Sequence, residues 1–422
     1  MKSEPKIRFP EFDDSYSCSY LSDYLTVNTA RNKDGAYSKE DVLSVSGEEG
    51  IVNQIQLLGR SYAGVSVLDY HIVNPDDIVY TKSPLKASPF GIIKCNKGQS
   101  GIVSTLYAVY TPKESVLPSY VEDYFALDSR LNRYLKPIVR IGAKHDMKVS
   151  NSAVLEGEVY FPSLSEQKKI ADFLSAYDKK ISLQKERVET LKEQKKGLLQ
   201  KMFPKKGETV PELRFPGFTG DWEQRKFDEV FDCTIPNNTL SRAELNYESG
   251  SVRNIHYGDI LIKYGSVVDV QNDEIPFATG KSSDDFKGAL LQDGDIIIAD
   301  TAEDETTGKA CEIGNSQGLD VVSGLHTMVC RPRNKMALGY LGYYLNSDAY
   351  HQQLLPLMQG IKVLSLSRTN VQKTMVYYPK NNVEQQLIAD CFRNLDNLIT
   401  LHQRKLETMQ EIKKGLLQQM FV

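Results

Sequence analysis

Two segments of the chain carry apolar residues at alternating spacings of four and three. Residues 166–203 align without a gap on residues 384–421, and 19 of the 38 aligned positions are identical. A period of about 3.5 residues sustained over about five heptads predicts coiled-coil helices, which most simply pack on each other as an antiparallel pair. The predicted contact positions are Ile170, Leu174, Tyr177, Ile181, Val188, Leu191, Leu198 and Met202 in the first segment, and Ile388, Phe392, Leu395, Ile399, Leu406, Met409, Leu416 and Met420 in the second.

Both apolar series are interrupted at the same two places. Gln184 and His402 occupy one layer, and Lys195 and Lys413 occupy the other. Two interpretations remain open: lysines that extend their charge to water near a helix end, and polar residues at Gln184 and His402 that fix the register. At the start of each segment, Ser163 before Glu166 and Asn381 before Glu384 predict capping boxes. Each helix would be roughly 57 Å long.

The duplication extends beyond these helices. The segment 7–12, which contains Arg-Phe-Pro, recurs at 213–218, and short β-branched runs such as 77–80 and 295–298 match and predict strands. Residues 118–137 and 336–356 have helical apolar spacing and end at proline, so each predicts one helix. The remaining sequence of the two copies diverges, as expected for one scaffold that presents two different loop sets.

These patterns predict an α+β chain with five parts. A first globular domain spans 1–162, a helix 163–203, a linker 204–212, a second globular domain 213–380, and a second helix 381–422. The linker prediction depends on the polar stretch from Pro204 to Pro211.

Composition and charge narrow the class of protein. The chain has 41 % hydrophobic and 25 % charged residues, its apolar runs are far shorter than a membrane span, and its six cysteines are scattered, so we expect a cytoplasmic protein without a disulfide framework. The net charge of −4 is unusual for a free-standing DNA-binding protein. Residues 166–203, however, carry ten basic and six acidic side chains. A nucleic-acid partner would therefore require local basic patches or phosphate contacts from another subunit.

Signatures of catalysis are missing from the sequence. Gly280-Lys281-Ser282 lacks the glycine that a phosphate loop needs five residues earlier, where Ile275 stands. The acidic residues between 293 and 305 have no lysine at nuclease spacing, and the six histidines form no HExxH motif. Residues 74–77 lack the second proline and the aromatic residue of an adenine methyltransferase motif. We therefore predict no catalytic residue and no metal site on this chain.

Three repeated motifs resemble one known family over essentially the whole chain. These are the Arg-Phe-Pro-x-Phe segment, the Glu-Gln helix start after Pro162 and Pro379, and the Lys-Lys-Gly-Leu-Leu-Gln-x-Met-Phe helix end. In this order they resemble the DNA-specificity (S) subunit of type I restriction-modification systems. The resemblance implies a non-catalytic subunit with two target recognition domains that read the halves of a split, asymmetric DNA site, with the paired helices as a spacer.

The resemblance also implies partners and cofactors. Double-stranded DNA, two methyltransferase (M) subunits and, through them, restriction (R) subunits would bind this chain. S-adenosylmethionine, ATP and magnesium would be bound by the partner subunits, with no cofactor on this chain. A coiled-coil adaptor whose duplicated domains bind only proteins is the alternative, and the low net basicity favours it slightly.

For base contacts, the resemblance points to the loop before the last strand of each domain, residues 142–148 and 360–368. The candidates in the first loop and in the basic run before it are Arg130, Arg133, Arg140, Lys144, His145 and Lys148, and those in the second loop are Lys362, Ser365, Ser367 and Arg368. Arg331, Arg333 and Lys335 are alternative positions for base contacts elsewhere in the second domain. The basic run before the first loop is equally consistent with a solvated helix face. The second loop departs from the usual polar composition at Val363, Leu364 and Leu366. Tyr62, Tyr80, Tyr257 and Tyr264 are further candidates, although tyrosines in strand-rich domains are more often packing residues.

Overall fold

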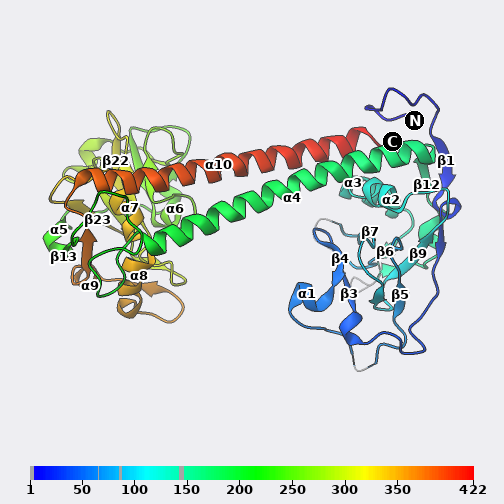
Figure 1. Cartoon of the computed structure of the whole chain (residues 1–422). Helices are drawn as coiled ribbons and strands as arrows, with labels where there is room; N and C mark the ends of the chain where they lie inside the picture. The colour runs from blue at the N-terminus through cyan, green and yellow to red at the C-terminus, as the bar shows by residue number, and fades with distance from the viewer. Residues whose placement is uncertain (1–3, 65, 85–87, 142–146) are drawn as a thin grey trace. The chain divides into compact units, whose positions relative to one another are not determined.

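The computed structural model describes residues 4–64, 66–84, 88–141 and 147–422 (Figure 1). The chain divides into two compact units. Unit 1 comprises residues 1–185 and 404–422, and unit 2 comprises residues 186–403. Each unit is α+β, as the sequence predicts, and each contains one part of the long helices α4 (Leu164–Lys201) and α10 (Asn382–Gln419).

Unit 1 is built on a four-stranded antiparallel sheet in the order β2-β9-β6-β7. A second ladder joins β1 to β12, and three further two-stranded ladders are β3·β4, β5·β8 and β10·β11. The strands are β1 (Ser17–Tyr20), β2 (Leu25–Val27), β3 (Leu43–Ser46), β4 (Gly50–Asn53), β5 (His71–Val73), β6 (Ile78–Tyr80), β7 (Ile93–Cys95), β8 (Gly101–Val103), β9 (Ala108–Pro112), β10 (Arg140–Ile141), β11 (Met147–Lys148) and β12 (Glu158–Phe161). The short helices are η1 (Leu21–Asp23), η2 (Lys39–Asp41), α1 (Gln54–Leu58), α2 (Pro118–Tyr124), α3 (Asp128–Leu135) and η4 (Ala153–Glu156).

Unit 2 has a five-stranded sheet in the order β14-β23-β19-β21-β17 and a four-stranded sheet in the order β15-β18-β16-β22. Two-stranded ladders join β13 to β25 and β20 to β24. The strands are β13 (Glu223–Lys226), β14 (Phe231–Asp232), β15 (Leu245–Asn246), β16 (Val252–Ile255), β17 (Val267–Asp269), β18 (Phe277–Ala278), β19 (Ile296–Ala299), β20 (Thr301–Ala302), β21 (Ala310–Gly314), β22 (Asp320–Ser323), β23 (Thr327–Pro332), β24 (Leu364–Ser365) and β25 (Met375–Tyr378). The short helices are α5 (Phe227–Val230), η5 (Arg242–Glu244), α6 (Tyr257–Ile262), η6 (Ser283–Phe286), α7 (Tyr340–Leu345), α8 (Asp348–Leu354), η7 (Leu355–Leu357) and α9 (Arg368–Val371).

The main sheets of the two units have the same strand order. The order β2-β9-β6-β7 of unit 1 matches β14-β23-β19-β21 of unit 2, which adds β17 in parallel at the edge. The outer ladders β1·β12 and β13·β25 also correspond. The secondary sheets differ, because β8 pairs antiparallel with β5 whereas β22 pairs parallel with β16. The duplication is therefore preserved in the main sheet and in the outer ladder, and it is lost in the secondary sheets.

The predicted helices at 118–137 and 336–356 are each two short helices, so the prediction of one helix per segment was wrong. In unit 1, α2 and α3 are separated at Leu127, and in unit 2, α7 and α8 are separated at Ser347. Both residues have extended backbone, with ψ of 121° and 152° respectively. Interruptions of three residues (125–127) and two residues (346–347), each ending in an extended residue, break the hydrogen-bond ladder without removing the apolar periodicity on which the prediction depended.

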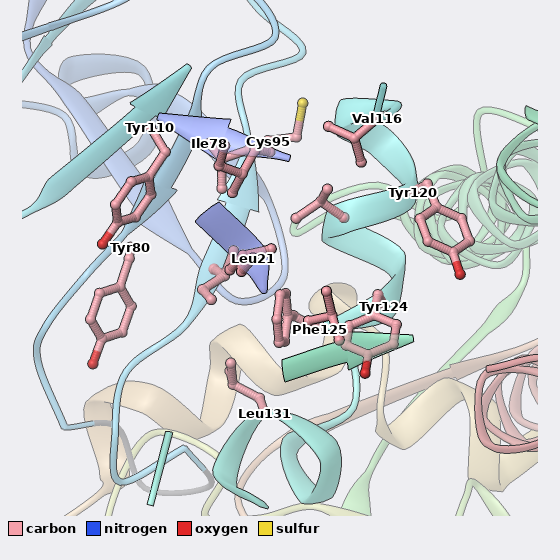
Figure 2. Packing of buried hydrophobic residues seen from close by; sticks show 14 of the residues in the cluster. Leu21, Ile78, Tyr80, Cys95, Tyr110, Val116, Tyr120, Tyr124, Phe125 and Leu131 are labelled. Carbon is pink, nitrogen blue, oxygen red and sulfur yellow. The ribbon is translucent and has the colours of Figure 1, made fainter. Parts of the chain in front are cut away.

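Aromatic side chains form much of the core of unit 1 (Figure 2). Tyr120 and Tyr124 lie on α2, and Phe125 lies next to Tyr124, with ring centroids 4.9 Å apart at nearly a right angle. Tyr80 and Tyr110 come from the neighbouring strands β6 and β9 and are both fully buried. Apolar residues at the ends of both long helices belong to the same cluster, so the helix ends are part of the domain core.

All of the predicted heptad residues are buried or half-buried in their units. The two lysines have a different role from the one suggested. In unit 2, Lys195 Nζ lies 2.5 Å from Asp396 Oδ1, and in unit 1, Lys413 Nζ lies 2.5 Å from Asp178 Oδ1. The two ion pairs correspond to each other, because Lys195 aligns with Lys413 and Asp178 aligns with Asp396 in the repeated segment. In each unit, the ion pair joins α4 to α10, which run antiparallel.

The predicted domain boundaries stay predictions, although the limits of α4 and α10 fall within three residues of the predicted helix limits. In the described part of the chain, no helix has the length and apolar character needed to cross a membrane.

Candidate nucleic-acid interface

A buried ion pair attaches the opening segment of each copy to the start of a long helix. Arg8 donates from Nε and Nη2 to the two carboxylate oxygens of Glu166, both at 2.8 Å, and Tyr16 donates its hydroxyl to Oε1 at 3.1 Å. Arg214 holds Glu384 in the same way, at 2.6 and 2.9 Å. Both glutamates are 1 % exposed. The expected capping role of these glutamates is therefore wrong: a distant arginine engages their carboxylates.

The glutamine that follows each glutamate is also explained by tertiary contacts. Gln167 accepts from the backbone N–H of Leu117 at 3.0 Å and donates to the carbonyl of Pro162 at 3.0 Å. Gln385 accepts from Ala337 N–H at 3.0 Å and donates to Pro379 at 2.8 Å. The repeated Glu-Gln pair thus orients each domain on the helix that follows it.

The repeated phenylalanine at the helix end packs into an aromatic pocket of a domain. In unit 1, Phe421 contacts Tyr120 and Tyr124, with centroid distances of 5.3 and 5.9 Å. In unit 2, Phe203 contacts Tyr340 and Tyr344 at 6.0 and 5.5 Å. Each domain is consequently held by the beginning of one long helix and the end of the other.

Arg130, a candidate for DNA contact, takes part in this packing. Its guanidinium carbon lies 5.1 Å from the centre of the Phe421 ring, and its Nη2 donates to the carbonyl of Leu417 at 2.8 Å. Burial lowers the pKa of Arg130, with Tyr124 opposing that effect. The structure therefore gives this arginine a role at the end of α10.

A basic site lies where the central strand β6 ends in unit 1. Lys82 follows the strand with φ of +46°, and its Nζ donates to Oδ1 of Asn151 at 3.0 Å. The Tyr80 hydroxyl donates to the carbonyl of Phe90 at 2.6 Å, and its oxygen lies 3.8 Å from the sulfur of Met147 in β11. The hairpin β10·β11, which flanks the predicted loop, therefore lies beside the end of β6. Arg140 and Lys148 are paired residues of this hairpin.

Arg31 and His71 complete this basic site. Their backbones form a β-bridge, and Arg31 Nη1 donates to the carbonyl of Asp69 at 2.6 Å. Burial, followed by the charges of Arg31 and Lys82, lowers the pKa of His71 to about 4. Burial and then Arg31 lower the pKa of Lys82. Since the acceptors on Arg31 and Lys82 are a backbone carbonyl and an amide, the two cations are not neutralised by carboxylates in these hydrogen bonds. We call Arg31, His71 and Lys82 the basic strand-end site.

The equivalent position in unit 2 has the opposite charge. Asp300 follows β19, and its Oδ1 accepts from Thr301 Oγ1 at 2.8 Å and lies 3.5 Å from Nδ1 of His326. His326 packs edge-on against Tyr257, with centroids 5.3 Å apart, and Tyr257 lies against His256 at 4.6 Å. We call Tyr257, Asp300 and His326 the acidic strand-end site.

The second predicted loop begins next to the acidic strand-end site. Thr301 and Ala302 pair with Ser365 and Leu364 in the ladder β20·β24. Two backbone hydrogen bonds between Gln359 and Ser365, at 3.0 and 2.8 Å, close the turn. Gly360 has φ of +129°, where a Cβ would lie 1.8 Å from the carbonyl oxygen of Val363. The turn therefore requires glycine at position 360. Lys362, within the turn, is exposed.

The other candidates have varied surroundings. Arg331 pairs with Asp295 at 2.6 and 2.7 Å, and Arg333 donates to the carbonyl of Asp228 at 3.2 Å. Arg133 is exposed on α3, and Ser367 accepts from Asn370 N–H at the start of α9, where Arg368 is the first helical residue. Lys144 and His145 lie outside the described residues.

The candidate tyrosines also differ. Tyr80 and Tyr264 are buried packing residues, Tyr257 belongs to the acidic strand-end site, and Tyr62 is exposed beneath Arg60, whose guanidinium lies 4.6 Å from the ring centre.

Sequence reasoning missed Arg31, His71, Lys82, Asp300 and His326. A signal was present, because Lys82 and Asp300 stand at the same distance after the matched runs 77–80 and 295–298. These two residues carry opposite charges at one position of the repeat, so the two copies differ in chemistry there. Among the described residues, no group of three or more His, Cys, Asp or Glu side chains is arranged to hold a metal ion.

Comparisons with known proteins agree with this architecture. The type I specificity subunit MjaVIII of Methanocaldococcus jannaschii is 24 % identical over 359 residues, covering 82 % of this chain and 78 % of that protein. The type I restriction-modification S subunit of M. genitalium has a similar fold, with a TM-score of 0.54 at 12 % identity over 99 % of both chains. A chain from a structural study of assembly and conformational transition in a type I system matches with a TM-score of 0.56 at 14 % identity, covering 95 % of this chain and 96 % of that one. The model of the type I restriction modification DNA specificity domain matches residues 65–193 and 219–411, and the chain therefore belongs to this family of specificity subunits.

Proposed function

We propose that this chain selects a bipartite, asymmetric DNA site, with one half read by each globular domain. The observation that carries the proposal is the contrast between the two strand-end sites. The same central strand leads to Lys82 in unit 1 and to Asp300 in unit 2, although the strand order of the main sheets is the same. Two scaffolds of one plan with different polar chemistry suit a target whose halves differ in sequence.

The chain acts together with partner subunits. Two methyltransferase subunits bind it, each placed over one half-site, and restriction subunits join through them. S-adenosylmethionine, ATP and magnesium belong to these partners, which carry the chemistry. Phosphate contacts from the methyltransferase subunits compensate for the chain's net charge of −4, because most non-specific affinity for DNA comes from neutralised phosphates.

A domain exchange tests the two-reader proposal. Residues 1–160 are replaced by the matching part of a related specificity subunit, and the chain is expressed with its methyltransferase partner in a host lacking other adenine methylation. Long-read sequencing then maps methyladenine. We expect a new sequence in one half-site, with the other half-site unchanged. A change in both halves would contradict separate readers.

The same map distinguishes the proposal from a protein-only adaptor. Expression of the unaltered chain with its partner should produce methyladenine at one split motif, and omission of the chain should abolish it. Methylation that does not depend on the chain would favour the adaptor. Co-purification of the methyltransferase subunit, measured alongside, establishes that the two proteins assemble in either case.

A further inference from the structure

Lys82 and Asp300 occupy corresponding places at the ends of the two central strands. Tyr80 in β6 pairs with Ala108 in β9, and the equivalent Ile298 in β19 pairs with Met328 in β23. Lys82 and Asp300 each stand two residues after these paired positions. Asp300 also donates its backbone N–H to the carbonyl of His326 at 3.1 Å. Side chains held at the end of a rigid sheet are placed more precisely than side chains on a free loop.

Lys82 can supply hydrogen bonds to a ligand. A lysine ammonium has three N–H donors and no acceptor, and one of these donors is directed to Asn151. The side chain is half-buried, and nearby Arg31 adds positive charge. An incoming group at this point must therefore be a hydrogen-bond acceptor with negative potential.

Asp300 offers the opposite function. Both of its contacts, Thr301 Oγ1 and His326 Nδ1, involve Oδ1. Among the described residues, none forms a hydrogen bond with the second oxygen, Oδ2, and the side chain is 25 % exposed. An ionised carboxylate only accepts hydrogen bonds, so a group that approaches Oδ2 must be a donor. Held by Thr301 and His326, the carboxylate loses little further freedom when it binds.

We propose that these two residues set opposite hydrogen-bond polarities for base reading: Lys82 donates to a guanine in one half-site, and Asp300 accepts from a cytosine in the other. In the major groove, guanine presents the acceptors N7 and O6, and cytosine presents the N4 amino donor. Adenine places an acceptor beside its amino group and suits an amide better than a carboxylate. This assignment rests on the proposed function, because it requires each domain to contact its own half-site.

Isosteric variants test the assignment in the full chain assembled with its methyltransferase partner. Asp300→Asn keeps the shape but adds donors, and Lys82→Met keeps the stem but removes the ammonium. We expect Asp300→Asn to lose discrimination at one base position of the unit 2 half-site by roughly 10- to 100-fold, and Lys82→Met to do so at one position of the unit 1 half-site. Asp300→Glu and Lys82→Arg should retain the original preference.

Matched controls use exposed residues of the same units. Asp284→Asn and Lys39→Met change the same side-chain types, and Asp284 is 87 % exposed. The methyladenine map of each control should equal that of the unaltered chain. Thermal melting and co-purification verify that every variant folds and assembles.

Each outcome has a defined meaning. If the unaltered chain produces no split motif, the proposed function fails. If it produces one but both variants leave every base position unchanged, the polarity assignment is overturned while the proposed function survives. A variant that methylates too weakly to map is measured by equilibrium binding to duplexes with single base changes. Equal loss of affinity for all duplexes, or a change in the opposite half-site, also overturns the assignment.

Discussion

Units 1 and 2 hold the long helices with equivalent side chains but end their central strands with opposite charges. Arg8 and Glu166 in unit 1 have counterparts in Arg214 and Glu384, down to the paired hydrogen bonds. Lys82 has no such counterpart, because Asp300 stands in its place. The helix junctions are alike, consistent with attachment to one shared framework, whereas the strand ends differ in charge. The proposed function explains this difference by a different half-site for each domain.

The largest expected effect comes from the phenylalanine at each helix end. Truncation of Phe421 to alanine should destabilise unit 1 by about 3 to 5 kcal/mol, because it empties a packed aromatic pocket. Phe203→Ala should do the same to unit 2. Hydrogen exchange measured by mass spectrometry on the full chain resolves the two units. Equal loss of protection in both units from either single variant would contradict independent pockets.

The buried arginine–glutamate pairs should come next. Arg8→Ala leaves Glu166 buried without its counter-charge, which should cost unit 1 about 3 kcal/mol, and Arg214→Ala should cost unit 2 a similar amount. The measurement is again unit-resolved hydrogen exchange. As a control, Glu166→Gln combined with Arg8→Ala should recover part of the loss, because a neutral amide is cheaper to bury than a carboxylate. No recovery would mean that the packing of Arg8, not its charge, is what matters.

A pH effect should distinguish the two units. The pKa of His71 is lowered to about 4 by burial, so the unfolded chain binds a proton between pH 6.5 and 4 that the folded chain does not. Stability of unit 1 should therefore fall as pH decreases through this window, by up to about 3 kcal/mol. His71→Gln should flatten this dependence, as followed by thermal melting. Unchanged pH dependence in this variant would assign the effect to other groups.

The smallest effect should come from the ion pairs between the helices. Lys195→Met and Lys413→Met remove equivalent contacts with Asp396 and Asp178, which are partly exposed. Each change should cost less than about 1 kcal/mol, because solvent screens such pairs. Melting temperatures at low and high salt provide the measurement. A large loss of stability from only one of the two changes would show that the two ion pairs, although equivalent in position, contribute unequally to stability.

Much of the fold is encoded in local patterns. The heptad series predicted both long helices, because apolar side chains that recur every 3.5 residues line one face of a helix, and that face is buried. The repeated runs predicted the central strands β6 and β19 for a similar reason. The duplication itself, visible from Arg-Phe-Pro to the helix end, predicted two units of one plan. The family motifs added the expectation of a specificity subunit.

The candidate site was less accessible to sequence reasoning. The loops chosen from the family resemblance do adjoin the strand-end sites through β11 and β24. Arg130 and Arg331, however, have partners within the fold, which a run of basic residues does not reveal. Whether a charged side chain is available to a ligand depends on what surrounds it, and that information is non-local.

The sequence by itself therefore determined the two helices, the repeated scaffold and the family, because periodicity and motif order are properties of neighbouring residues. Tertiary structure decided the partners of the repeated motifs and the identity of the strand-end sites. Arg8 and Glu166 are 158 residues apart. Arg31 and His71 come together only when strands form a bridge. Such contacts are created by the closing of long loops around a core, and no local pattern specifies which residues will meet.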